Sequence, residues 1–417
     1  MTYAEAIGFL NGLRMFGANF GLDTTRKLAA LAGDPHAQLR FVHVAGTNGK
    51  GSTCAILESI YRAAGLRVGL FTSPHLVSFR ERVQVNRQLI GEADVARLVG
   101  EMRAQLQTLE PTFFEFVTVM ALRHFAEQKC DLVIWETGLG GRLDATNIVT
   151  PLASVITNIS FDHQQWLGDT LAKIAAEKAG ILKPGVPAIT ATDEPEALEV
   201  IRETARRQGA PLTIVAKGEA VAPIVSMLGE HQRRNAALAL ATVRVLQDKI
   251  PVSEIVMPSA LAFVQWPGRL QVVQRGAQTL LLDGAHNPAG AITLRTALRQ
   301  HFPQSKPVLV LGILRDKDWR SICEILAPLA DAIFLVPVHS ERTSAPDELR
   351  VACESANPAA KVTVCGSLAA ALEQAACAPF VVITGSLYLV GEAMERLNLS
   401  GNVAPGERDL NEWAGPR

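Results

Sequence analysis

The sequence lacks the cysteine patterns that would indicate a disulfide framework or a zinc site. Its six cysteines are scattered along the chain, and none of them belongs to a C-x-x-C pair. Secreted disulfide scaffolds and zinc modules both depend on cysteines at short, paired spacings, so the pattern argues against both classes. Unpaired cysteines are typical of proteins in a reducing compartment, and we expect a cytoplasmic protein.

Long apolar runs and a surplus of one charge are also missing. No run approaches the ~20 residues of a membrane-spanning helix, and the N-terminus, MTYAEAIGFLNGLRMFG, has the pattern of an amphipathic helix rather than of a signal peptide. The net charge of −1 argues against a nucleic-acid-binding or polybasic membrane surface. We expect no nucleic acid and no membrane among the partners, and we expect a monomer.

A glycine-rich stretch at residues 44–53 follows a predicted strand and leads into a predicted helix. In such a turn, backbone N–H groups converge on an anion, and the helix N-terminus adds the positive end of its dipole. Lys50 supplies a charge for phosphate oxygens, although Gly51 separates it from Ser52 and breaks the strict G-x-x-x-x-G-K-[ST] pattern. An ordinary glycine-rich turn remains an alternative. The predicted phosphate loop comprises Gly46, Thr47, Asn48, Gly49, Lys50, Gly51, Ser52 and Thr53.

Polar side chains follow the carboxyl ends of three further predicted strands. They are Ser73, Glu136 and His163, and open α/β sheets bind ligands at that edge. Ser73 could contact Mg²⁺ or only stabilise a turn. Glu136 could hold a metal or an attacking water, or serve as a cap. His163 could be a ligand or a structural histidine.

Other polar residues give weaker signals. Lys178, in a predicted helix over 170–182, would by itself be interpreted as solvated. Asn235 begins a long predicted helix and could contact a base or phosphate, or cap the helix. Glu115 could be a site acid or a solvated first-turn residue. The turn-rich segment 17–23 could cover a ligand or simply join two helices.

A second series of alternating strands and helices follows Trp266-Pro267-Gly268, which has the character of a domain linker. Strands are predicted at 278–283, 307–312, 332–337, 361–365 and 380–384. Two of them end in polar clusters, one at Asp283 and His286, the other at a Gly-Ser turn with Ser386 that suits an anion. The alternation predicts an α/β fold with mainly parallel sheets. The chain is long enough for two or three domains.

Ten stretches together resemble one family, the folylpolyglutamate synthases and dihydrofolate synthases of the Mur ligase superfamily. They occur in the family's order and span nearly the whole chain. The stretches are HVAGTNGKGST (43–53), LFTSPHLVSFRERVQVN (70–86), ETGLGGRLDATN (136–147), ITNISFDHQQWLG (156–168), IAAEKAGILK (174–183), HQRRNAALAL (231–240), WPGRLQ (266–271), DGAHNPAGA (283–291), GILRDKDW (312–319) and TGSLYLVGE (384–392).

The resemblance implies a P-loop-like ATPase domain, expected over residues 1–267, and a smaller Rossmann-like domain, expected over 268–417, with ATP between them. It implies a Mg²⁺ on Ser52, Ser73 and Glu136, and a second Mg²⁺ on His163 near Glu136. Lys178 matches a lysine that the family carbamylates. Further roles follow by position: catalysis for Lys50, Lys178, His163 and His286; nucleotide binding for Asn235, Arg269 and Asp283; substrate binding for Arg82, Asp283, His286 and Ser386.

The activity implied by the resemblance is the ATP-dependent joining of L-glutamate to a folate carboxylate through an acyl phosphate. The acceptor would be tetrahydrofolate and also dihydropteroate. One alternative is a Mur ligase acting on a UDP-linked substrate, but only 42 residues precede His43, and an additional domain needs about 50–250. The other alternative is a nucleotide-switch protein that hydrolyses ATP without ligation, and it would need no amino-acid pocket.

Overall fold

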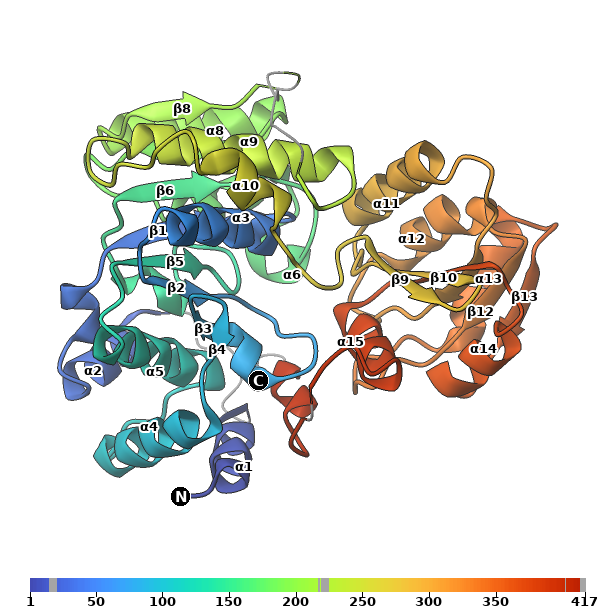
Figure 1. Ribbon diagram of the computed structural model, residues 1–417, viewed down its shortest axis with the longest axis horizontal. Coiled ribbons are helices and arrows are strands. Elements are labelled where there is room, and N and C mark those ends of the chain that lie inside the picture. Colours follow the sequence, from blue (N-terminus) through green and yellow to red (C-terminus); the bar gives the residue numbers. More distant parts are fainter. Residues whose placement is uncertain (15–20, 217, 219–224, 402, 413–417) are drawn as a thin grey trace.

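The computed structural model describes residues 1–14, 21–216, 218, 225–401 and 403–412, and two α/β units lie side by side in it (Figure 1). Within these residues the first unit contains an eight-stranded sheet and the second a six-stranded sheet. The predicted α/β class is confirmed. The residue at which one domain passes into the other stays a prediction.

The first sheet has the order β4-β3-β2-β5-β1-β6-β7-β8. Its central strands pair in parallel, whereas β2, β3 and β4 pair antiparallel at one edge. Strands β1, β5 and β6 are buried along their whole length, as expected for a sheet covered on both faces. In chain order the strands are β1 (Phe41–Ala45), β2 (Val68–Phe71), β3 (Val83–Val85), β4 (Gln88–Leu89), β5 (Leu132–Glu136), β6 (Ala153–Ile156), β7 (Ala188–Thr190) and β8 (Leu212–Ile214).

Helices cover both faces of this sheet. One hydrophobic core lies beneath α3, α9 and α10, and a second lies beneath α1, α2, α4 and α5. A third core joins α7 and α8 to the strands at the β8 side. The helices are α1 (Tyr3–Leu13), α2 (Asp23–Leu31), α3 (Lys50–Ala63), α4 (Glu92–Gln105), α5 (Phe113–Glu127), α6 (Gln164–Leu167), α7 (Leu171–Ala179), α8 (Pro195–Arg207), α9 (Glu230–Val245) and α10 (Met257–Ala262).

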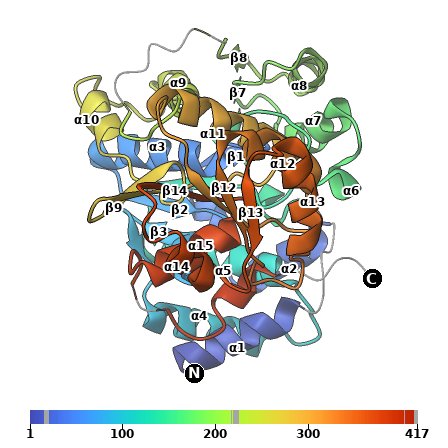
Figure 2. The ribbon, with the colours of Figure 1, turned by 90° about the vertical axis from the view of Figure 1, so that its right-hand side faces the viewer.

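The second sheet has the order β13-β12-β11-β14-β10-β9, and only its edge strand β9 is antiparallel. Helices α11, α12 and α13 cover one face, and α14 and α15 cover the other (Figure 2). Its elements are β9 (Gln271–Arg275), β10 (Gln278–Leu282), α11 (Pro288–His301), β11 (Val308–Leu311), α12 (Trp319–Leu326), β12 (Ala332–Leu335), α13 (Pro346–Ala356), β13 (Lys361–Val364), α14 (Leu368–Gln374), β14 (Phe380–Thr384) and α15 (Leu387–Arg396).

After α15 the chain returns to the first domain. Residues 403–412, which we call the C-terminal strap, include the 3₁₀ helix η6 (Arg408–Asn411) and lie beside α1 (red segment in Figure 1). Leu410 is 1% exposed and belongs to the hydrophobic core beneath α1 and α5. The two domains are therefore connected twice, by the linker near Trp266 and by the strap.

A helix that could cross a membrane, long enough and apolar enough, does not occur among the described residues.

Candidate active site

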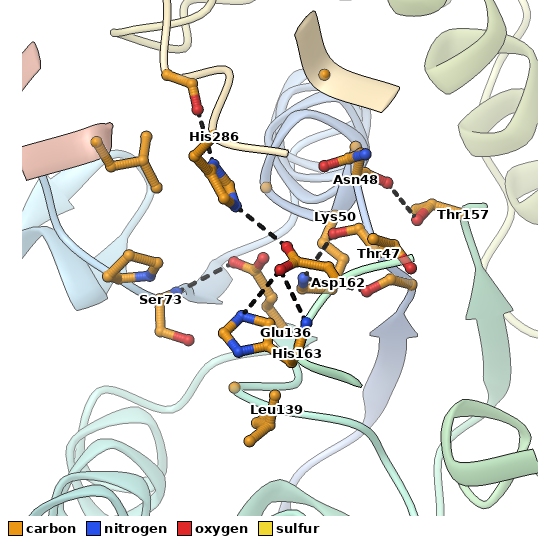
Figure 3. Close-up of a pocket in the computed structure, with 18 of the residues that line it drawn as sticks. Thr47, Asn48, Lys50, Ser73, Glu136, Leu139, Thr157, Asp162, His163 and His286 are labelled. Carbon is orange, nitrogen blue, oxygen red and sulfur yellow. Dashed lines mark hydrogen bonds and ion pairs between the residues drawn. The ribbon is translucent and has the colours of Figure 1, made fainter. Parts of the chain in front are cut away.

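A cavity of about 640 Å³ lies where the carboxyl ends of the two sheets face each other. Nearly all the residues predicted from the sequence line it: the loop from Gly46 to Ser52, Ser73, Arg82, Glu136, His163, Lys178, Asn235, Arg269, Asp283, His286 and Ser386. Thr53 is the exception, because its hydroxyl is buried within α3 and has no hydrogen-bond partner. Figure 3 shows several of these side chains directed toward a common centre.

The predicted phosphate loop joins β1 to α3, whose first residue is Lys50. Gly46 has a φ of +147°, and a Cβ there would lie 1.9 Å from Thr157 Oγ1, so only glycine fits. Asn158 Oδ1 accepts a hydrogen bond of 2.8 Å from the Asn48 N–H. The Lys50 ammonium donates to the carbonyl oxygens of Gly46 and Thr47, at 3.1 and 3.3 Å, and so folds back over the loop. Loop and ammonium together form a cationic cradle at a helix N-terminus.

Glu136 is the last residue of β5 and lies beside β1 at the centre of the sheet. Its side chain is buried, and its Oε2 accepts a hydrogen bond of 3.1 Å from the Ser73 N–H (Figure 3). Burial raises the pKa of Glu136 to about 7, against the opposing effect of the Lys50 charge. The structure therefore brings together Glu136, Ser73 and the phosphate loop.

Lys178 lies in the last turn of α7 and is 4% exposed. Its ammonium donates a hydrogen bond of 2.9 Å to the carbonyl oxygen of Gly46 in the phosphate loop. Burial lowers the pKa of Lys178 to about 7, and the nearby Lys50 charge adds to the effect. A solvated lysine is therefore excluded, and a large fraction of Lys178 is an uncharged amine near pH 7.

Asp162 connects the two domains at the centre of the cavity. It lies 2.6 Å from Lys317 Nζ and 3.4 Å from His286 Nε2, and it accepts a hydrogen bond of 3.0 Å from Asn287 Nδ2, all from the second domain. Burial alone would raise its pKa, but the His286 hydrogen bond and the Lys317 charge hold the pKa of Asp162 well below its usual range. The carboxylate is therefore ionised and paired.

His163 also faces the second domain. Its Nε2 lies 3.1 Å from Lys317 Nζ. Burial, reinforced by the Lys317 charge, lowers the pKa of His163 to about 3, so the ring is neutral near pH 7. A neutral imidazole is suited to accept a hydrogen bond or bind a metal, and in this structure its neighbour is an ammonium group.

The remaining predicted residues occupy the walls of the cavity. A Cβ on Gly49 would meet Asn235 Oδ1 at 2.6 Å, so Asn235 lies against the phosphate loop. Asp283 is buried and Arg269 is half-buried. Burial lowers the pKa of Arg269 and raises that of Asp283, while their mutual attraction opposes both shifts. Ser386 caps α15 by accepting a hydrogen bond from the Tyr388 N–H.

The structure decides between the two alternatives for Glu115 but not between those for the turn-rich segment 17–23. Glu115 is buried and forms a capping box with Thr112 at the start of α5, yet it also lines the cavity, so it is not a solvated residue. In the turn-rich segment 17–23, residues 17–20 lie outside the described residues, and Gly21 lines the cavity.

Sequence reasoning did not select Asp162, Lys317 or Arg342, although all three line the cavity. Asp162 directly precedes the predicted His163, so its position beyond a strand end was a usable signal. Lys317 lies in a charged loop, and the sequence around Arg342 is as compatible with a ligand contact as with a solvated connection. Among the described residues, no three or more His, Cys, Asp or Glu side chains are grouped to hold a metal.

Two domain families match the chain. Residues 44–243 match the Mur ligase middle domain, and residues 268–387 match the Mur ligase glutamate ligase domain. These matches cover the phosphate-loop domain and the Rossmann-like domain in turn. Together with the cavity between the two sheets, they define a Mur ligase type of protein.

Similar curated proteins and solved structures identify a particular family among the Mur ligases. The dihydrofolate synthase/folylpolyglutamate synthase of Bacillus subtilis is 37% identical over 95% of this chain and 99% of its own length. The Escherichia coli FolC structure in complex with DHPP and ADP has a TM-score of 0.85 and 32% identity, covering 96% of this chain and 98% of that chain. The Mycobacterium tuberculosis folylpolyglutamate synthase complexed with ADP has a TM-score of 0.86 and 30% identity, covering 96% and 99%. The chain belongs to the dihydrofolate synthase/folylpolyglutamate synthase family.

Proposed function

We propose that this protein is an ADP-forming ligase that joins L-glutamate to a folate carboxylate. The observation that carries the proposal is the shared cavity: a phosphate loop from one domain faces Asp283, His286 and Ser386 from the other. A protein that only hydrolysed ATP would not need this second set of polar residues. The ADP complexes of the Escherichia coli and Mycobacterium tuberculosis relatives support ATP as the nucleotide.

The residues fit one Mg²⁺ better than two. Mg²⁺ is commonly held by one or two carboxylates together with substrate phosphates and water. Glu136, a buried carboxylate that accepts a hydrogen bond from the Ser73 N–H and lines the same cavity as Ser52, suits such a site. The second site proposed on His163 would require Lys317 to move away from its Nε2. A bound Mg²⁺ would supply neutralisation of phosphate charge.

The proposed reaction transfers the γ-phosphoryl group of ATP to the substrate carboxylate, which gives an acyl phosphate and ADP. The amine of L-glutamate then attacks the acyl carbon, and phosphate leaves. Phosphoryl transfer depends mainly on positioning and charge stabilisation, which the loop N–H groups and Lys50 would provide. The contacts of Lys317 and His286 to Asp162 hold the second domain over the loop and would keep water from the acyl phosphate.

Several finer points belong to the same proposal. Carbamylation would convert Lys178 from a cation into an anion beside the loop, and its uncharged amine is the form that reacts with CO₂. The relatives from Bacillus subtilis and Escherichia coli are named dihydrofolate synthases as well as folylpolyglutamate synthases, which supports dihydropteroate as an acceptor in addition to folates. We also propose that the protein acts as a monomer in the cytoplasm.

The test is product formation by the purified protein with ATP, Mg²⁺ and L-glutamate, using dihydropteroate and tetrahydrofolate in separate reactions. We expect mass spectrometry to detect a product that is heavier than the acceptor by one glutamate residue. We expect a coupled assay to detect the release of one ADP for each bond formed. ATP turnover that is indifferent to both acceptor and glutamate would show that the protein is not a ligase.

A further inference from the structure

The C-terminal strap contacts the loop of the first domain that carries the three cavity residues Ser73, Pro74 and Arg82. This loop, residues 73–82, begins at Ser73, whose N–H donates to Glu136, and ends with the 3₁₀ helix η3 (Phe79–Arg82). Arg82 is 4% exposed and lines the cavity. Whatever holds this loop in place therefore sets the position of a buried guanidinium in the site.

Glu407 of the strap anchors the loop. Its side chain is 1% exposed, and its Oε2 accepts hydrogen bonds from Ser78 Oγ at 2.7 Å and from the Phe79 N–H at 2.6 Å. The backbone oxygen of Glu407 lies 2.9 Å from His75 Nε2. Hydrogen bonds to a buried carboxylate are among the stronger ones in proteins, so this anchor fixes the backbone directly before Arg82.

Asn411 of the strap holds the Arg82 guanidinium itself. Its Oδ1 accepts a hydrogen bond of 2.7 Å from Arg82 Nη2, and its Nδ2 donates one of 2.9 Å to the backbone oxygen of His75. His75 Nδ1 lies 2.8 Å from Arg82 Nε on the other side. Both partners are neutral: burial lowers the pKa of His75 well below its ordinary value, and Asn411 is an amide. They orient the guanidinium without cancelling its charge.

The strap also reaches an arginine of the second domain. Arg342 Nε lies 3.6 Å from Glu412 Oε2, and Arg342 Nη2 donates a hydrogen bond of 2.7 Å to the Tyr388 hydroxyl. That hydroxyl in turn donates to the backbone oxygen of Asn411. Asn411, Glu412 and both arginines line the cavity. The end of the strap thus joins one arginine from each domain on a single wall.

We propose that Asn411 and Glu412 are positioning residues of a carboxylate subsite, in which Arg82 and Arg342 bind a carboxylate of L-glutamate or of the folate tail. A planar guanidinium is suited to bidentate carboxylate recognition, and an oriented one loses less freedom on binding. The inference rests on the proposed ligase activity, because only that activity brings carboxylates into the cavity.

The test uses Asn411→Ala and the isosteric Asn411→Asp. Alanine releases Arg82, whereas aspartate places a fixed anion on it that competes with the substrate. We expect each variant to raise the KM for one carboxylate substrate about tenfold, the cost of one charged hydrogen bond, and to leave the KM for ATP unchanged. L-Glutamate is varied at saturating acceptor and the acceptor at saturating L-glutamate, so that the two arms identify which carboxylate is bound.

The matched control is Asp409→Asn, because Asp409 is an exposed residue of the same strap. We expect it to behave as the wild type. In an Arg82→Ala background, Asn411→Asp should raise the KM much less than it does in the wild type, because most of its effect acts through Arg82 and only the lost hydrogen bond to the His75 backbone oxygen remains. Thermal denaturation shows which variants are folded. If Asn411→Ala unfolds the protein, the isosteric Asn411→Asp carries the test alone.

The outcomes separate this inference from the proposed function. A wild-type protein that forms no glutamylated product contradicts the proposed function. The subsite is overturned if the wild type ligates and Asn411→Asp has normal KM values for both carboxylate substrates. It is also overturned if the effect of Asn411→Asp on the KM adds fully to that of Arg82→Ala.

Discussion

We expect carbamylation of Lys178 to increase with pH, over a pH range that is set by the lowered pKa of its buried amine. CO₂ reacts only with the neutral amine, forming the N–C bond of a carbamate and releasing a proton. With a pKa of about 7, about nine tenths of the Lys178 side chains are neutral at pH 8 and about one tenth at pH 6. With the ordinary lysine value of 10.5, about 0.3% would be neutral at pH 8. Burial therefore makes the reactive form about 300 times more abundant at pH 8.

The assay exposes the protein to ¹³CO₂ at fixed pressure and detects the carbamate carbon by NMR while turnover is measured in parallel. We expect incorporation at pH 8 that falls at pH 6, and turnover that rises with added CO₂. Lys178→Arg keeps a cation but cannot be carbamylated, and we expect it to lose about 10²–10³ in turnover, as for other oriented electrostatic groups. Lys173→Arg, on the exposed side of the same helix, is the control. Full turnover by Lys178→Arg would refute the reasoning.

Three further changes test the site. Lys50→Ala should abolish ATP-dependent product formation at an unchanged melting temperature, and turnover near that of the wild type would contradict the phosphate-loop assignment. Asp162→Asn leaves the buried Lys317 ammonium without its partner, which should destabilise the protein by about 3–5 kcal/mol; chemical denaturation should show that adding Lys317→Met recovers most of the loss. Gly51→Ala places a Cβ 2.9 Å from the Trp266 indole, so the loop or the indole must shift, and steady-state kinetics should show a raised KM for ATP.

The positions of Ser73, Glu136 and the phosphate loop could be predicted because they follow from a rule about sheets. Residues at the carboxyl ends of neighbouring parallel strands meet at one edge, and β1, β2 and β5 are neighbours here. The same rule placed Asp283 and Ser386 at one edge of the second sheet, whose strands β10 and β14 pair in parallel.

Contacts between the domains could not be predicted in this way. The pairing of Asp162 with Lys317 depends on how two separate sheets face each other, and no periodicity within either segment encodes that. Edge strand β9 was missed because its half-exposed, polar-rich sequence carries little hydrophobic signal. The C-terminal strap has no amphipathic period either, and Glu407, its buried anchor, resembles a solvated charge in the sequence.

Glu136 and Lys178 are buried titratable groups beside the phosphate loop that have opposite charges when ionised, and burial shifts both toward neutrality. It raises the pKa of Glu136 and lowers that of Lys178, in each case to about 7. A divalent cation next to Glu136 would favour its ionised form, and a carbamate on Lys178 would replace a disfavoured ammonium by an anion that Lys50 can balance. Because burial disfavours the charged form of both groups, we expect a bound cation and a carbamate to complete the electrostatics of the cavity. A site of this kind favours the full set of substrates over any one of them, which is what a reaction through a water-sensitive acyl phosphate requires.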